Sequence, residues 1–166
     1  MIGKVDFLPF LSNKPTKIFV QGSSMSPYLQ TGDAVFVIKT RSEEIEEGDL
    51  IVFKRENETY VHRAIIKGKD KFYEVGDNQI LGSWVDLNFP LGKVVSIERK
   101  EGTFFDVNSK EDKKLAKRMV TLQKLRRKKA SVRNGAKIRI VRLSLNYIFS
   151  AIEFLLKLRV FSIRGQ

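Results

Sequence analysis

The sequence has 166 residues, of which 31 are Lys or Arg and 19 are Asp or Glu, so its formal net charge at pH 7 is +12. This length fits one compact domain with an appended segment, and the 42% share of hydrophobic residues excludes a disordered chain. The lack of cysteine excludes disulfides, thiolate metal sites and a cysteine nucleophile, while the single histidine, His62, excludes multi-histidine metal centres.

The first two thirds of the chain favour strands. Short runs of β-branched and aromatic residues alternate with turns rich in glycine and aspartate. The predicted strands cover residues 17–21, 34–39, 50–54, 59–66, 71–75 and 93–98. Since no segment with helical periodicity interrupts them, the expected fold is mainly β, as an antiparallel sheet or a partly closed barrel.

The positive charge lies in the last third of the chain. Residues 1–112 carry 15 basic and 18 acidic side chains, whereas residues 113–166 carry 16 basic side chains and one acidic side chain, Glu153. An excess of this sign predicts an anionic partner, either nucleic acid or a membrane surface. The charge therefore belongs to a segment rather than to the whole protein.

This basic segment favours helices. Apolar residues recur at helical spacing over residues 110–130, and a second, largely apolar helix with a narrow polar stripe is predicted over residues 136–163. We therefore expect a β domain over residues 1–108 and a basic, amphipathic α-helical extension over residues 109–166.

Three interpretations of the extension stay open. A membrane-spanning helix needs about 20 largely uncharged residues. Within the extension, the longest stretch without Lys or Arg is residues 143–156, which is shorter than this and contains Glu153. A helix lying in the interface of an anionic membrane, through residues 113–164, fits the pattern better. Packing on the domain or on another subunit is the second interpretation, and binding of nucleic acid is the third and least favoured.

The strongest local motif is QGSSMSPYLQTGD, residues 21–33. A predicted strand runs into small residues and Ser24, followed by Met25 and Pro27. Such a turn exposes a hydroxyl at a strand end beside free backbone N–H groups, as a serine nucleophile and its oxyanion require. The same composition also occurs in ordinary turns.

Three further residues strengthen the interpretation of Ser24 as a nucleophile. His62 lies inside a predicted strand, and a neutral imidazole accepts a serine proton near pH 7. Asp77 and Asp86 follow in a loop-rich stretch, where either carboxylate could orient the imidazole. Both residue types also have structural explanations. A histidine in a strand is more often a hydrogen-bonded structural residue than a base, and Gly-Asp-Asn is common in turns.

The order and context of these residues resemble type I signal peptidases, in the wider clan that also holds the self-cleaving repressors. The resemblance covers roughly residues 17–98 and keeps its motifs in order. They are SMSP (24–27) with GD (32–33), GDLIVF (48–53), VHR (61–63), GDN (76–78) with Asp86, and GKVV (92–95). His62 stands where bacterial signal peptidases and the repressors have a lysine base, so the resemblance is to the histidine type found in the endoplasmic reticulum and in archaea.

The resemblance implies a largely β fold and a serine endopeptidase that cleaves signal or leader peptides after small residues. Ser24 would be the nucleophile and His62 the general base. Asp86 is the first choice as the residue that orients His62, and Asp77 is the second choice or a structural support. The backbone N–H of Ser24 and the hydroxyl of Ser23 would form the oxyanion site. Together with Ser23, the flanking Met25 and Pro27 are assigned to the oxyanion and substrate-binding region.

The resemblance also bears on location. The first 17 residues hold only one short apolar patch, FLPFL, so we expect no N-terminal anchor of the signal peptidase kind. Peripheral membrane attachment through the extension is therefore expected. Basic helices favour the cytoplasmic leaflet, and attachment at the other side of the membrane stays open as the alternative. No metal or organic cofactor is predicted, since no nucleotide or phosphate fingerprint occurs.

Two other functions remain as alternatives. One is a repressor-type regulator whose basic extension binds nucleic acid, and the other is a non-catalytic β module held at a membrane. A non-catalytic module predicts that Ser24 and His62 lie beyond hydrogen-bonding distance.

Overall fold

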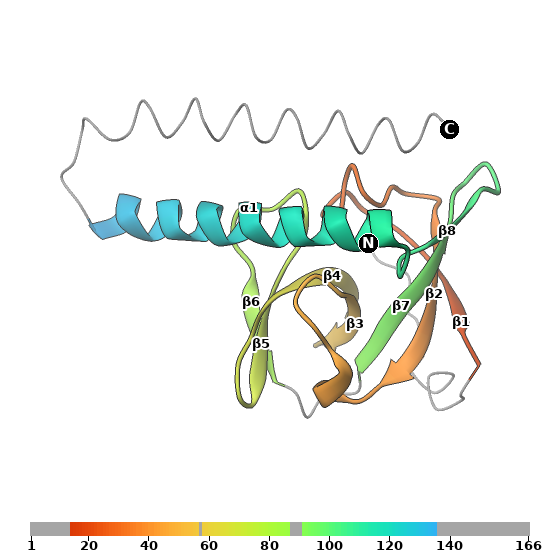
Figure 1. Ribbon diagram of the computed structural model, residues 1–166, viewed down its shortest axis with the longest axis horizontal. Helices are drawn as coiled ribbons and strands as arrows, with labels where there is room; N and C mark the ends of the chain where they lie inside the picture. Colours follow the sequence, from red (N-terminus) through yellow and green to blue (C-terminus); the bar gives the residue numbers. More distant parts are fainter. Residues whose placement is uncertain (1–13, 57, 87–90, 136–166) are drawn as a thin grey trace.

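The computed structural model describes residues 14–56, 58–86 and 91–135 (Figure 1). Its elements are β1 (Thr16–Phe19), β2 (Ala34–Thr40), the 3-10 turn η2 (Ser42–Glu44), β3 (Leu50–Arg55), β4 (Glu58–Lys67), β5 (Lys71–Val75), β6 (Ser83–Asp86), β7 (Leu91–Glu98), β8 (Phe104–Asp106) and α1 (Lys110–Gly135). The expectation of a mainly β fold with a C-terminal helix is confirmed. All six predicted strands are present, and the short strands β6 and β8 were not predicted.

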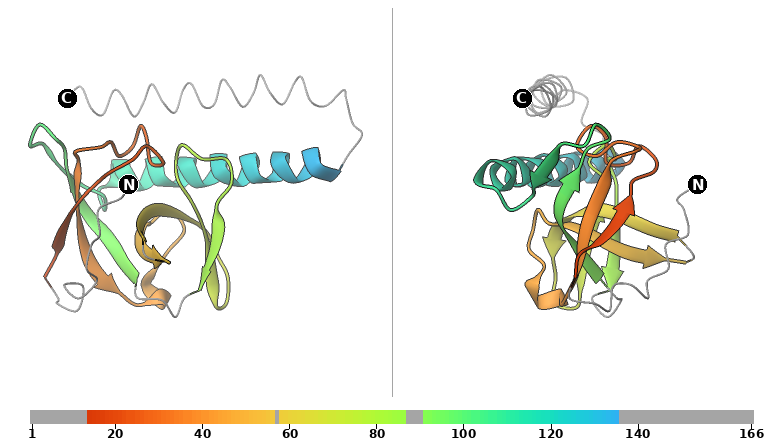
Figure 2. Two further views of the ribbon diagram at one scale, coloured as in Figure 1. Left: turned by 180° about the vertical axis from the view of Figure 1, so that it is seen from behind. Right: turned by 90° about the vertical axis from the view of Figure 1, so that its right-hand side faces the viewer.

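The strands form one strongly curved antiparallel sheet (Figures 1 and 2). Its order is β1-β2-β7-β3-β4-β5-β6, and β8 pairs with β7. The long strand β4 lies between β3 and β5, with Ile51 opposite His62 on one side and Glu74 opposite Ala64 on the other. This pairing places functional groups of neighbouring strands within reach of each other.

Helix α1 is part of the core of the β unit. It lies along one end of the sheet, beside the loop that joins β5 to β6 (Figures 1 and 2). Leu115, Met119 and Leu122 are buried in the same apolar cluster as side chains of β1, β2, β3 and β7. These are three of the positions that helical spacing predicted to be apolar. The first half of the helix therefore stabilises the sheet that carries the candidate site.

Polar contacts also attach α1 to the sheet. The hydroxyl of Tyr28 donates a hydrogen bond to Asp112, with 2.6 Å between the oxygens, and Lys124 forms an ion pair with Glu47. Among the described residues, none belongs to a helix that is long and apolar enough to cross a membrane. The second predicted helix, over residues 136–163, lies outside the described residues.

Candidate active site

Ser24 lies in the loop that joins β1 to β2. The base of this loop is closed by backbone hydrogen bonds between Val20 and Asp33 and between Gly32 and Val20. At its tip, the N–H of Ser26 donates to the carbonyl of Ser23, at 3.0 Å. The small residues around Ser24 allow this tight turn, which leaves the Ser24 side chain half-buried.

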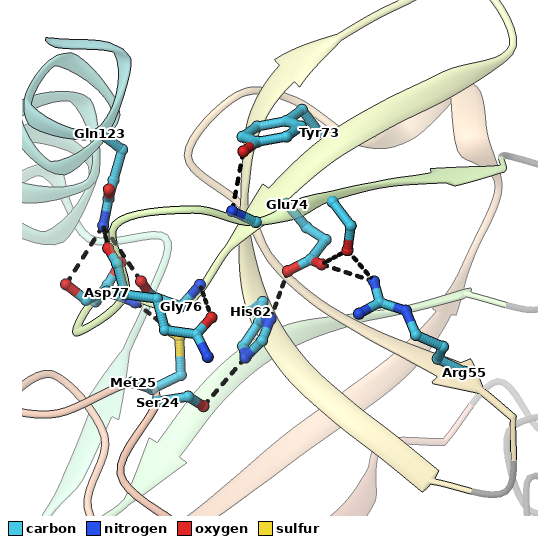
Figure 3. Close-up of polar contacts among 12 residues, drawn as sticks. Ser24, Met25, Arg55, His62, Tyr73, Glu74, Gly76, Asp77 and Gln123 are labelled. Atoms are coloured by element: carbon cyan, nitrogen blue, oxygen red, sulfur yellow. Dashed lines mark hydrogen bonds and ion pairs between the residues drawn. The ribbon is translucent and has the colours of Figure 1, made fainter. Parts of the chain in front are cut away.

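His62 lies opposite the loop, near the middle of β4. Its ring is only 4% exposed and packs against Phe53 and Tyr60. The Nε2 atom of His62 is 3.1 Å from the Oγ atom of Ser24 (Figure 3). The structure thus brings together the two residues that the sequence predicted as nucleophile and base.

The other ring nitrogen of His62 has a partner that sequence analysis missed. The Nδ1 atom forms a hydrogen bond with a carboxylate oxygen of Glu74, on the neighbouring strand β5 (Figure 3). Glu74 is 1% exposed, and its second oxygen accepts hydrogen bonds from Arg55, at 2.8 Å, and from Ser83, at 2.7 Å. These three hydrogen bonds hold the carboxylate in one orientation.

These contacts keep Glu74 ionised. Burial by itself raises the pKa of the Glu74 carboxyl, but the hydrogen bond and charge of His62 and the hydrogen bonds from Arg55 and Ser83 outweigh it, so the net pKa is lowered. An ionised carboxylate accepts a hydrogen bond from the Nδ1–H group of His62. This tautomer leaves Nε2 as the acceptor for the hydroxyl of Ser24.

Asp77 does not orient His62, although it was one of the two predicted candidates. Its carboxylate receives a bidentate ion pair from Arg63, at 2.8 Å from Nε and 2.7 Å from Nη2, and both side chains are buried. Burial lowers the pKa of Arg63, but the charge and hydrogen bonds of Asp77 more than offset this and raise it. Arg63 also donates to the carbonyl of Gly48, at 2.9 Å. The Asp77 carboxylate thus pairs with Arg63 rather than with His62.

Asp86, the first choice from the sequence, does not reach His62 either. It ends β6, where it lies opposite Lys71 and is exposed. Ser24 and Glu74 already occupy the two ring nitrogens of His62. The predicted candidates lay in a loop-rich stretch, whereas the carboxylate that contacts His62 comes from strand β5.

The loop that contains Asp77 supports the nucleophile directly. The backbone N–H of Asn78 donates to the carbonyl of Ser24, at 2.8 Å. A Cβ atom at Gly76 would lie 2.6 Å from that same carbonyl oxygen, so only glycine allows this approach. The backbone position of Ser24 therefore depends on the loop of residues 76–79.

A glutamine of α1 holds this loop in turn. The side chain of Gln123 is 1% exposed, and its Nε2 atom lies 3.2 to 3.3 Å from the carbonyl oxygens of Gly76, Asp77 and Gln79 (Figure 3). Arg126 adds a contact to the carbonyl of Asp77, at 3.3 Å. Hydrogen bonds thus run from the helix through the loop to Ser24. Sequence analysis missed Gln123, since a glutamine in a highly basic helix is expected to face solvent.

The remaining predicted residues divide between the surface and the core. Ser23 is exposed, and its carbonyl receives the side-chain amide of Asn78, whereas Pro27 is half-buried. Met25 was assigned to the substrate side, but it is buried in the main core, with its sulfur 3.4 Å from the backbone nitrogen of Asp77. The structure therefore places this side chain inside the protein rather than at its surface.

Two further observations concern the chemistry that the site can perform. Within residues 14–56, 58–86 and 91–135, the backbone N–H of Ser24 has no hydrogen-bond acceptor, so it can donate to a developing oxyanion. In the same ranges, no group of three or more His, Asp or Glu side chains could hold a metal ion. The arrangement has the parts of a nucleophilic serine with an oriented base.

Comparison with known families agrees with this geometry. Residues 10–80 match the family model described as Peptidase S24-like. The match supports a peptidase or self-cleaving repressor function in general. It includes Ser24, His62 and Glu74 and ends before Asp86 and α1. No curated protein and no solved structure matches significantly.

Proposed function

We propose that the protein is a serine endopeptidase in which Ser24, His62 and Glu74 act as nucleophile, general base and orienting carboxylate. The observation that carries the proposal is the continuous series of hydrogen bonds from Ser24 Oγ through both nitrogens of His62 to Glu74. A histidine held in this way is the arrangement that activates a serine hydroxyl.

The reaction follows from the positions of these groups. The Oγ atom of Ser24 attacks the carbonyl carbon of the scissile peptide while its proton moves to Nε2 of His62. The oxyanion that forms accepts a hydrogen bond from the backbone N–H of Ser24. Each such donor lowers the activation barrier by about 3 kcal/mol. His62 then protonates the leaving amine as the C–N bond breaks. Water, deprotonated by His62, finally hydrolyses the ester of Ser24 and restores the enzyme.

The substrate class is the finer part of the proposal. The resemblance to histidine-type signal peptidases supports signal or leader peptides with small residues before the scissile bond. Peripheral attachment to an anionic membrane, through the basic segment of residues 113–164 and at the cytoplasmic face, is proposed together with it. In its described part, this segment carries the exposed basic residues of α1.

The proposal is tested with purified full-length protein and a peptide library that varies residues on both sides of a labelled bond. We expect cleavage after small residues, lost on Ser24→Ala and on His62→Ala. Asp86→Asn is the matched control and should cleave as the unaltered protein does. Cleavage that persists in His62→Ala contradicts the proposed mechanism.

The repressor-type alternative predicts a different result. Its reaction is cleavage of the protein's own chain, without cleavage of added peptide, and its partner is DNA, bound with a steep salt dependence. Mass spectrometry of the incubated protein, with Ser24→Ala as the reference, distinguishes the two reactions.

A further inference from the structure

An exposed apolar cluster lies on the loop that joins β5 to β6 and on the first residues of β6. Ile80, Leu81 and Trp84 are 63%, 59% and 42% exposed, respectively. Scattered surface apolar residues are common, but three large ones within five positions form a cluster that indicates an interaction site. We call these three residues the loop patch.

Cationic side chains surround the loop patch. The guanidinium carbon of Arg127 lies 5.7 Å from the centroid of the Trp84 ring and 4.4 Å from that of Tyr73. The Nζ atom of Lys71 lies 5.4 Å from the centroid of the Trp84 ring. Arg126 contacts the carbonyl of Asp77 in the same loop. An apolar surface with a tryptophan and a border of Lys and Arg fits the boundary between lipid headgroups and acyl chains.

The loop patch is joined to the candidate active site through its own loop. Asn78, two residues before Ile80, donates to the carbonyl of Ser24. The neighbouring Gln79 is held against Gln123 of α1. As Figure 1 shows, this loop rises beside α1, so the patch and the basic helix lie on the same side of the sheet. A surface that binds the patch would therefore also lie near Ser24.

We propose that the loop patch inserts into the headgroup region of an anionic membrane and is a membrane contact of the β unit itself. Charge complementarity decides between lipid and protein as the occupant. The described part of α1 from Lys113 to Ser131 contains no acidic residue, so the helix that contacts the patch through Arg127 is strongly cationic over this length. The inference extends the proposed membrane attachment of residues 113–164 and does not depend on peptidase activity.

Trp84 provides a direct test because it is the sequence's only tryptophan. The full chain with Ser24→Ala is mixed with vesicles of neutral phosphatidylcholine or with vesicles that also contain anionic phosphatidylglycerol. We expect the Trp84 emission to shift to shorter wavelength with the anionic vesicles. Lipids brominated on the acyl chain should then quench the emission.

Substitutions locate the contact. Ile80→Ser with Leu81→Ser should lower the partition coefficient on anionic vesicles by about ten-fold and reduce the quenching by brominated lipid. Phe104→Ser is the matched control, since Phe104 is 63% exposed on β8, outside the loop patch, and its loss should change neither quantity. Thermal unfolding of each variant establishes that the fold is retained.

Two outcomes would overturn the proposal. Sedimentation of the protein with anionic vesicles without quenching of Trp84 assigns membrane binding to the helical segment alone. A Trp84 shift caused by an apolar peptide but not by vesicles makes the patch a protein-binding surface. The inactive Ser24→Ala background keeps both results separate from success or failure of the proposed peptidase reaction.

Discussion

Glu74 and His62 form a buried hydrogen-bonded pair across two neighbouring antiparallel strands, at the side of the imidazole opposite Ser24. Both groups sit on regular strands rather than on loops, and Arg55 and Ser83 fix the far side of the carboxylate. The orientation of His62 is therefore determined by the sheet itself, whereas the position of Ser24 is determined by loops.

The first prediction concerns the charge of Glu74. Glu74→Gln keeps the shape of the side chain but no longer favours the His62 tautomer that accepts a proton at Nε2. We expect kcat for peptide cleavage to fall by about 10³-fold or more. Steady-state kinetics measure this, and circular dichroism tests whether the fold is retained. Full activity in Glu74→Gln together with loss of activity in Asp86→Asn would contradict this prediction. It would indicate that Asp86 orients the His62 imidazole.

A second prediction follows from the lowered pKa of Glu74. The ordinary value is 4.5, and the folded-state value lies below it, so the unfolded chain binds the proton first as the pH falls. The contribution of Glu74 to the free energy of unfolding is present above pH 4.5 and is lost as the pH falls through its folded-state pKa. Urea unfolding of the Ser24→Ala protein between pH 7 and pH 3 should show this decrease.

The control for the pH experiment is Glu74→Gln in the same background. Its unfolding free energy should be lower at neutral pH and should decline less steeply in acid, because the substituted group does not titrate. Identical acid slopes in the two proteins would show that Glu74 is not a source of the pH dependence.

The third prediction concerns the buried ion pair of Arg63 and Asp77. Removing one partner leaves a buried charge without compensation, so Asp77→Asn and Arg63→Met should each lower the free energy of unfolding by about 3–5 kcal/mol. The double variant Arg63→Met with Asp77→Asn should cost less than the two single changes added together. Denaturant titration of all four proteins measures the coupling, and strictly additive losses would contradict it.

The fourth prediction tests the link from α1 to the nucleophile. Gln123→Ala removes the donor that holds the carbonyls of residues 76, 77 and 79, so we expect kcat to fall by about ten-fold with little change in KM. Thr121→Ala, on the exposed face of the same helix, should leave kcat unchanged. If Gln123→Ala lowers the free energy of unfolding but leaves kcat unchanged, Gln123 has a structural role only.

Much of the site could be predicted from sequence because its two reactive residues carry distinctive signals. Ser24 stands in a turn of small residues, and the sequence has only one histidine. Glu74 had a signal that was passed over. It is an acidic residue within the strand KFYEV, flanked by Tyr73 and Val75, and a carboxylate in such a strand needs a buried partner.

The rest depends on tertiary contacts that no local pattern contains. Helical spacing predicted that Leu115, Met119 and Leu122 share a face, but not that this face would join the core of the sheet. The short strands β6 and β8 are defined by their pairing with β5 and β7 rather than by their own composition. Both features come from residues distant in the chain.

The dependence of Ser24 on Gln123 has a consequence for biosynthesis. The ribosome makes Ser24, His62 and Glu74 well before the residue that secures the loop beneath the nucleophile, since the chain is synthesised from its N-terminus. A nascent chain whose α1 segment has not yet been synthesised contains all three residues but lacks the support of the helix. Under the proposed function, full activity would therefore be acquired only after Gln123 has been synthesised and α1 has packed against the loop.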